Sequence, residues 1–290
     1  MELQQLRYVL AVADTMSFTR AAQRCFVVQS SLSHQIKALE SELGVRLFAR
    51  TSRRVELTEA GTAFLPGARA ALESADRAAQ DAAAATGEVR GQLTIGTIPT
   101  LTAVDLPGAL RRFCGRHPHV GVTSRTGNSD DLAAAVRAGE IDVAFLGLPD
   151  TTEPRGGRIR RLARERLVAV VPHAHRLADR RRVHLRDLAD EPFADFPTRS
   201  PGRTQSDNAF AAAALSRRVA FEAMDAALIL DLVGNGLAVA LLPAGVVPER
   251  AELSSLPVVD GPRRTEYLMW SDFNPTPAAT AFLAELAVQT

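Results

Sequence analysis

A short polar run near the N-terminus has the residue types that contact nucleic acid. It combines one amide, three hydroxyls, one imidazole and one amine: Gln29, Ser30, Ser31, Ser33, His34 and Lys37. A glutamine amide can pair with adenine in the major groove, and small hydroxyl residues let a helix enter that groove. The run therefore predicts a DNA-contacting helix face. The alternative is an ordinary solvated helix face, for which polar residues are also typical.

Three arginines follow within a segment that is flanked by β-prone residues. Arg50, Arg53 and Arg54 lie between the segments 45–48 and 55–57. This pattern predicts two short strands around a basic turn, a wing that contacts the DNA backbone or the minor groove. Residues 1–58 contain eight basic and five acidic side chains, whereas the formal net charge of the whole chain is only +1. The positive charge is therefore concentrated in the N-terminal segment, which suits phosphate contact.

The rest of the chain has several points where a strand is expected to lead into a helix N-terminus. One of them is Thr100, which is expected to begin a helix over residues 100–116. Free backbone N–H groups at such points favour an anion, which predicts a small carboxylate as the ligand class. Ordinary helix capping by threonine and asparagine is the competing interpretation. The candidate contacts are Pro99, Thr100, Leu101, Thr126, Gly127, Phe145, Gly147, Pro197, Thr198, Arg199 and Met224.

Neither a catalytic nor a metal-binding constellation is expected. The sequence has no Gly-rich phosphate loop and no nucleophile elbow. The histidine pairs 117/119 and 173/175 have no nearby cluster of Cys or Glu, so we expect no metal and no cofactor. Cys25 and Cys114 are too few for a disulfide framework and fit a reducing cytoplasm. A redox sensor using Cys114 is kept as an alternative, although it would need a resolving partner.

The elements that position the first polar run follow from hydrophobic spacing. Leu32, Ile36, Leu39 and Leu43 form one stripe of a helix over residues 29–43, which Gly44 is expected to end. A shorter helix before it is expected to be capped by Thr19. Two such helices joined by a tight turn predict a helix-turn-helix.

A long Ala-rich helix is expected next, over residues 59–88. Thr58 can cap this helix, and the residue pair 66–67, Pro-Gly, is expected to bend it near its start. Small side chains along one face let two helices approach closely, which favours pairing with a second copy. The pair 86–87, Thr-Gly, is the expected hinge after it.

Beyond residue 91, β-rich runs alternate with helical runs, which predicts α/β architecture with parallel strands. A length of 290 residues suggests two domains. No apolar run approaches the roughly 20 residues that span a bilayer, and the N-terminus lacks the pattern of a signal peptide. We therefore expect a cytoplasmic protein with no membrane partner. A two-lobed solute-binding protein or enzyme is the alternative, which would lack residues 1–58.

The sequence resembles the LysR-type transcriptional regulators. The resemblance is carried by Leu6-Arg7-Tyr8, the segments 17–22, 29–36 and 57–61, and the pairs Leu39-Glu40, Leu43-Gly44 and Leu47-Phe48 with Arg50. Weaker matches follow at 139–142, 190–193 and 234–237. Two departures affect the expected base preference but not the fold. Val28 replaces a frequent serine before the helix, and His34 replaces a frequent arginine.

Family membership implies a winged helix-turn-helix over residues 1–58 and a dimerising linker helix over 59–88. It also implies a two-lobed α/β effector-binding domain over 89–290, similar to periplasmic binding proteins. Lobe I is expected at about 91–162 and 265–290, and lobe II at about 163–264. The candidate ligand contacts would then line the cleft between the lobes. The expected partners are double-stranded DNA with an interrupted inverted repeat, a small effector, and copies of the chain in a homodimer and homotetramer.

Overall fold

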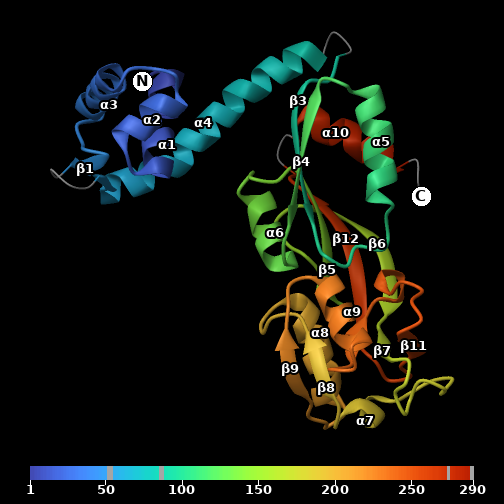
Figure 1. The fold of residues 1–290 in the computed structure, drawn as a ribbon. Coiled ribbons are helices and arrows are strands. Elements are labelled where there is room, and N and C mark those ends of the chain that lie inside the picture. The colour runs from blue at the N-terminus through green and yellow to red at the C-terminus, as the bar shows by residue number, and fades with distance from the viewer. Residues whose placement is uncertain (51–54, 85–87, 273–274, 288–290) are drawn as a thin grey trace. The chain divides into compact units, whose positions relative to one another are not determined.

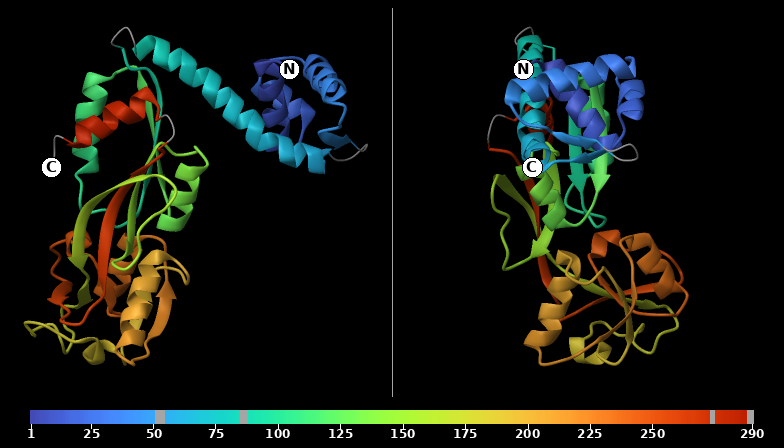
Figure 2. Two further views of the ribbon diagram at one scale, coloured as in Figure 1. Left: turned by 180° about the vertical axis from the view of Figure 1, so that it is seen from behind. Right: turned by 90° about the vertical axis from the view of Figure 1, so that its left-hand side faces the viewer.

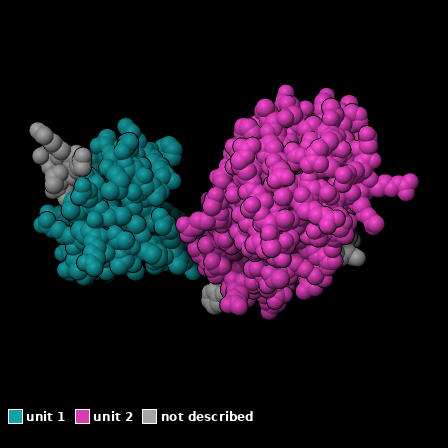
Figure 3. Space-filling view, turned by 90° about the horizontal axis from the view of Figure 1, so that it is seen from below, with its two compact units in different colours: residues 1–87 teal, residues 88–290 magenta. Residues whose placement is uncertain are grey.

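The structure is a computed structural model that describes residues 1–50, 55–84, 88–272 and 275–287. The chain divides into two compact units, Met1–Gly87 and Glu88–Thr290, which Figure 3 shows in different colours. Each unit has its own hydrophobic core. Among the helices of the described ranges, none has both the length and the apolar character needed to span a bilayer.

The N-terminal unit consists of helices around one core and a small two-stranded sheet. Its elements are α1 (Leu3–Thr15), α2 (Phe18–Arg24), α3 (Gln29–Leu43), β1 (Phe48–Arg50), β2 (Val55–Leu57) and α4 (Glu59–Ala84). Leu32, Ile36 and Leu39 are fully buried against α1 and α2, as their spacing predicts, but Leu43, the fourth member of the predicted stripe, is exposed at the end of α3. β1 pairs with β2 in antiparallel register, which confirms the predicted strand at 55–57. The first strand begins at Phe48 and not at Val45, so it includes Arg50, which the sequence placed in the turn.

The helix ends of this unit follow local capping chemistry, with one correction. Gly44 ends α3 in the left-handed region at φ +69°, as expected. The hydroxyl of Thr58 accepts a hydrogen bond from the backbone N–H of Gly61 at 2.9 Å, which confirms it as the cap of α4. The cap of α2 is Ser17 and not Thr19, because α2 begins at Phe18, two residues before the start that a Thr19 cap implies.

The long helix α4 packs onto the N-terminal core with its first turns. Leu65 and Ala68 are buried there, and Arg69 lies 3.7 Å from the Asp14 carboxylate. The helix continues through Pro66 and reaches Ala84. The expected hinge at residues 86–87 lies outside the described residues.

The C-terminal unit has two lobes, and a five-stranded sheet forms the first (Figure 1). The strand order is β4 (Val120–Thr126), β3 (Gly91–Thr97), β5 (Val143–Pro149), β12 (Arg263–Trp270) and β6 (Arg158–Arg166). Helices α5 (Leu106–Arg116) and α10 (Pro277–Ala287) cover one face, and α6 (Ser129–Arg137) covers the other. β5 therefore buries side chains on both faces, with Phe145 toward α5 and Leu146 toward α6.

The second lobe is built around β7 (Val168–Pro172). β7 pairs in antiparallel fashion with β10 (Ala240–Leu242) and β11 (Leu253–Pro257). A separate parallel pair is formed by β8 (Pro192–Asp195) and β9 (Arg218–Glu222). The helical elements of this lobe are α7 (Leu185–Leu188), α8 (Pro201–Ala212), α9 (Ala226–Gly234) and the 3-10 turn η1 (Ala244–Val246).

The expectation of parallel strands holds only in part. β3 runs parallel to β4 and β5, but β12 is antiparallel to both of its neighbours. The reason is that β12 returns from the second lobe and enters the first sheet from the opposite end (Figures 1 and 2). β6 leaves that sheet beside it, and the backbone N–H of Leu167 donates to the carbonyl of Pro262 at 3.0 Å.

The two crossing strands therefore lie side by side where the lobes meet. Residues 163–166 and 263–264, which the sequence assigns to lobe II, belong to the strands of the first sheet.

Candidate functional site

The polar run of residues 29–37 lies on α3, opposite the buried stripe of that helix. Gln29, Ser30, Ser31, His34 and Lys37 are exposed, and Ser33 is half-buried. α3 begins at Gln29, and the preceding Val28 contributes no side-chain capping bond, as the loss of a serine hydroxyl implies. These side chains lie within the first nine residues of one helix, as the spacing predicts.

The wing is fixed to α3 through one carboxylate. Glu40 accepts hydrogen bonds from the backbone N–H groups of Leu47 at 2.8 Å and Phe48 at 3.1 Å. Arg50 is the last residue of β1, and its side chain is not among those described. Arg53 and Arg54 lie outside the described residues. The strands of the predicted wing are therefore present, and its arginine contacts remain a prediction.

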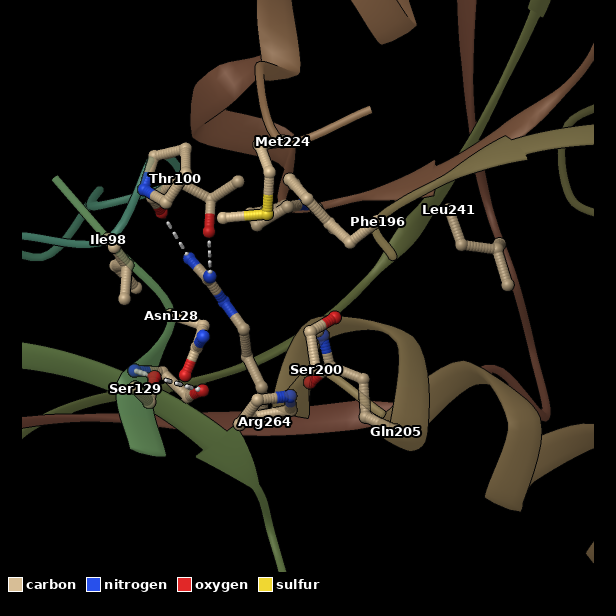
Figure 4. Close-up of a pocket in the computed structure, with 16 residues that line it drawn as sticks. Ile98, Thr100, Asn128, Ser129, Phe196, Ser200, Gln205, Met224, Leu241 and Arg264 are labelled. Atoms are coloured by element: carbon tan, nitrogen blue, oxygen red, sulfur yellow. Dashed lines mark hydrogen bonds between the residues drawn. The ribbon is translucent and has the colours of Figure 1, made fainter. Parts of the chain in front are cut away.

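A second site lies between the two lobes of the C-terminal unit, where α8 packs near β5 across the cleft. The cavity there is narrow, with a volume of about 40 Å³, which is room for roughly three water molecules. Residues of both lobes line it (Figure 4): Ile98, Pro99, Thr100, Gly127, Asn128, Ser129, Gly147, Phe196, Ser200, Pro201, Gly202, Gln205, Met224, Leu241, Pro243 and Arg264. Any ligand larger than a few heavy atoms therefore requires the lobes to separate.

Five of the predicted ligand contacts line this cavity: Pro99, Thr100, Gly127, Gly147 and Met224. The other six do not. Phe145 is fully buried in the core of the first lobe, and Leu101 packs beside that core. Both point into the lobe because an apolar side chain gains more from the core than from a polar cleft.

The remaining four predicted contacts lie in exposed or half-buried positions outside the lining of the cavity. Thr126 is exposed at the end of the edge strand β4. The hydroxyl of Thr198 donates to the carboxylate of Glu222 at 2.8 Å, and Thr198 is not among the residues that line the cavity. Arg199 is exposed and Pro197 is half-buried. The turn before α8 therefore approaches the cavity through Phe196 and Ser200 and not through the three residues between them.

Two helix N-termini reach the cavity from opposite lobes. Asn128 caps α6 by accepting from the backbone N–H of Asp131 at 3.0 Å. Ser200 caps α8 by accepting from the backbone N–H of Arg203 at 3.3 Å. Both caps line the cavity, so the positive ends of two helix dipoles are close to any ligand held there.

The predicted helix at Thr100 is wrong, because α5 begins only at Leu106 after the Asp105 cap. Thr100 instead receives a buried guanidinium. Nη1 of Arg264 donates to the Thr100 hydroxyl, and Nη2 donates to the Thr100 carbonyl, each at 2.7 Å. Figure 4 shows this contact at the wall of the cavity. The hydroxyl thus accepts from the protein, and its own hydrogen remains available to a ligand.

Two carboxylates, Glu165 and Glu266, neutralise the charge of Arg264. Its Nε donates to Glu165 at 2.9 Å, and its Nη2 contacts Glu266. Glu266 is fully buried and also accepts from the backbone N–H groups of Thr102 and Ala103, each at 3.1 Å. Arg264 and Glu266 lie on β12 and Glu165 lies on β6, so this buried network is located where the chain crosses between the lobes.

Eleven residues of the cavity lining were not predicted from the sequence, for different reasons. Asn128, Ser129 and Ser200 directly adjoin predicted positions, and the Ser-Pro pair at 200–201 is a local signal for a capped helix start. Arg264 carried no such signal, because it is one of many arginines and its partner Glu165 lies 99 positions away. Gln205 lies in the second turn of α8 and has no sequence feature that marks it.

Neither cysteine has the surroundings of a redox pair. Cys25 is half-buried in the N-terminal core, and Cys114 is exposed on α5. The sequence has no other cysteine, so the C-terminal unit has no resolving partner for Cys114. Across the described ranges, no group of three or more His, Cys, Asp and Glu residues is arranged to hold a metal ion.

Comparison with known proteins decides the family. The profile described as a bacterial regulatory helix-turn-helix protein of the lysR family matches residues 3–62. The profile described as the LysR substrate binding domain matches residues 86–289. The chain is a LysR-type transcriptional regulator. It is therefore a DNA-binding protein with an effector-binding domain, and not an enzyme.

Relatives of this regulator match over nearly its whole length. It is 34% identical to the uncharacterized HTH-type transcriptional regulator YnfL of Escherichia coli strain K12, over 98% of this chain and 97% of that protein. It is also 34% identical to the HTH-type transcriptional regulator IlvR of Caulobacter vibrioides, over 93% and 92%. Full-length CbnR, solved in complex with its target DNA, is 29% identical and superimposes with a TM-score of 0.73 over 100% of both chains.

Proposed function

We propose that this LysR-type regulator responds to a small carboxylate held between the two lobes of its C-terminal unit. The observation that carries the proposal is the convergence of two helix N-termini, from α6 and α8, on one narrow cavity. The backbone N–H groups and dipoles at both ends favour an anion over a neutral ligand. The small volume of the cavity favours a compact molecule.

Arg264 also lies at the wall of the cavity, but Glu165 and Glu266 already neutralise its charge, so the preference for an anion rests on the two helix N-termini. Arg264 is the one charged residue among those that line the cavity within the described chain. Its guanidinium is already held by Thr100, Glu165 and Glu266, so it is oriented before a ligand arrives. A bound carboxylate would compete with these partners at the crossing strands. Ligand binding would thereby shift the closure of the lobes, because a ligand favours whichever arrangement it contacts best.

The DNA half of the proposal assigns roles on α3. Gln29 reads a base in the major groove, and Ser30, Ser31, Ser33, His34 and Lys37 contact base edges or phosphates. Arg50, Arg53 and Arg54 contact the backbone or the minor groove from the wing. Two copies paired through α4 would present two α3 helices to an interrupted inverted repeat, and two such pairs would form the tetramer expected from the family.

A pair of variants tests the DNA assignment in the full-length protein. The probe is a duplex selected from a random pool by the protein itself. Gln29→Ala should reduce discrimination at one base pair by about 1–3 kcal/mol. Arg53→Ala should weaken binding to the selected duplex and to random DNA alike and reduce the salt dependence. If Gln29→Ala weakened both DNAs equally, the role of Gln29 as a base reader would be refuted.

Matched acids and amides test the ligand class. Thermal unfolding of the full-length protein is measured with benzoate against benzamide and with succinate against succinamide. A ligand at about 100 times its Kd stabilises the folded state by about 2.7 kcal/mol. For a unit of this size, that corresponds to a rise in Tm of roughly 5–11 °C. The acids should raise Tm and the amides should not, whereas equal rises would contradict the carboxylate assignment.

A further inference from the structure

One buried polar atom at the cavity, Oε1 of Gln205, has no hydrogen-bond partner among the described residues. Gln205 on α8 lines the cavity between the lobes and is only 7% exposed. Within the part of the chain that the structure describes, its buried Oε1 accepts no hydrogen bond. A buried acceptor without a donor is destabilising, and most buried polar atoms in proteins are paired. The position of Gln205 therefore calls for a partner that the protein itself does not provide.

The other polar side chains around the cavity already have partners inside the protein. The Thr100 hydroxyl accepts from Arg264, and Asn128 Oδ1 accepts from the backbone of residue 131. Ser129 Oγ donates to the carbonyl of Gly147 at 3.0 Å and accepts from its N–H at 2.9 Å. Ser200 Oγ donates to the carbonyl of residue 197 at 2.8 Å. Gln205 thus differs from its neighbours and is the side chain best prepared to bind a ligand group.

Its neighbours on α8 do not compete for the amide. Arg203 pairs with Asp207 through Nε at 3.1 Å and with Glu222 through Nη1 at 3.0 Å. The Thr204 hydroxyl donates to the carbonyl of Ser200 at 2.9 Å. Arg203 and Thr204 are therefore engaged elsewhere, whereas Ser206 Oγ is buried without a hydrogen-bond partner among the described residues and does not line the cavity.

We infer that the effector carries a hydrogen-bond donor, a hydroxyl or an ammonium, beside its carboxylate, and that Gln205 accepts from that donor. This inference rests on the proposed carboxylate function. The Nε2 atom of the same amide can donate to the carboxylate, so one glutamine satisfies both groups of a 2-hydroxy or 2-amino acid. A rotation of the amide by 180° exchanges the two atoms, and the same pair of ligand groups still satisfies them.

The rest of the cavity fits the remainder of such a molecule. Apolar side chains complete its wall, among them Ile98, Phe196, Met224, Leu241 and Pro243. They can cover a short aliphatic chain, whereas the polar end of the ligand lies against Gln205 and the two helix N-termini. The effector class is therefore a small hydroxy- or amino-carboxylate with an aliphatic remainder.

The test uses sets of three acids that differ in a single substituent. The probes are propionate, lactate and alanine; succinate, malate and aspartate; and 4-methylpentanoate, its 2-hydroxy derivative and leucine. Dissociation constants are obtained from thermal shifts of the full-length protein. In at least one set, the hydroxy or amino acid should bind at least about tenfold more tightly than the plain acid. Which of the two is preferred identifies the donor as hydroxyl or ammonium.

A substitution at Gln205 links that preference to its amide. Gln205→Met keeps a side chain of similar length and removes both polar atoms, so the tenfold preference should fall to less than about threefold. The unliganded variant should keep its Tm, because the substitution removes an unpartnered polar atom. Gln92→Met on β3, outside the cavity lining, is the matched control and should keep the full preference.

The possible failures are distinguishable. If the plain acids bind as tightly as their hydroxy and amino counterparts, or if Gln205→Met keeps the preference, the inference about the donor is overturned and the carboxylate proposal stands. If no acid of any set raises Tm, the carboxylate proposal itself is refuted, and the inference about Gln205 with it.

Discussion

Removal of the Arg264 guanidinium should strongly destabilise the C-terminal unit. In Arg264→Met, the apolar stem of the side chain is largely preserved, but Glu266 and Glu165 lose the charge that lies between them. Glu266 is fully buried, so its carboxylate would remain in a site of low dielectric constant. Breaking a buried pair by removing one partner typically costs about 3–5 kcal/mol.

The remaining contacts determine where in that range the loss should fall. Glu266 keeps hydrogen bonds from the backbone N–H groups of Thr102 and Ala103, each at 3.1 Å, and from the Thr102 hydroxyl at 2.7 Å. These partially compensate the charge, so the lower end, about 3 kcal/mol, is expected. For a unit of this size, that corresponds to a fall in Tm of about 6–12 °C.

Calorimetric unfolding of the full-length protein at neutral pH measures the fall in Tm of Arg264→Met. Two further variants test whether the unpaired buried charge causes it. Arg164→Met removes another arginine–carboxylate pair, but one whose arginine is exposed, so its cost should stay below about 1 kcal/mol. Adding Glu266→Gln to Arg264→Met should restore at least half of the lost Tm, because it removes the unpaired buried charge. If Arg264→Met were as mild as Arg164→Met, or if Glu266→Gln restored nothing, the argument from buried charge would be refuted.

Two smaller predictions concern other contacts. A Cβ on Gly61 would lie 2.1 Å from the backbone oxygen of Leu47, so Gly61→Ala should destabilise the N-terminal unit by about 1–3 kcal/mol in denaturant unfolding, whereas Gly67→Ala, where the space is open, should not. The hydrogen bonds from Arg164 hold the pKa of Asp150 below its usual value. The stability that the Asp150 carboxylate contributes is therefore fully present above its pKa in the unfolded state, about 3.9. It is lost as the pH falls through the lower pKa of the folded state. The Tm difference between wild type and Asp150→Asn should accordingly shrink between about pH 6 and about pH 3, and a constant difference would contradict the assignment.

The sequence predicted the N-terminal unit more closely than the C-terminal one, because its determinants are local. The stripe on α3 and its terminal glycine are separated by only a few positions, so periodicity determines the helix and its exposed face. The cap of α2 was predicted two positions too late, at Thr19 instead of Ser17. Ser17 and Thr19 are both good caps, and only the position of the first helical residue distinguishes them.

The cavity was predicted only in part because its walls come from distant segments. Gly127 and Gly147 were predicted to line the cavity because they lie at the ends of predicted strands, which sequence patterns can locate. Arg264 contacts Thr100 across 164 positions, and no local pattern distinguishes this arginine from the solvated ones. Thr100 itself was placed in the cavity for the wrong reason. Its segment forms a turn and a bend before the Asp105 cap, and Thr100 contacts a buried cation instead of a helix N-terminus.

The position of β12 in the first sheet has a consequence for the order in which the protein is made. β12 covers residues 263–270 but lies between β5 and β6, so β6 joins the sheet only through it. During synthesis, the nascent chain cannot complete the first lobe until β12, the last strand of the described chain, has left the ribosome. The N-terminal unit ends at residue 87 and contains all of its own core, so it can fold much earlier. A chain that is truncated before β12 would therefore have a folded DNA-binding unit joined to an incomplete effector-binding domain.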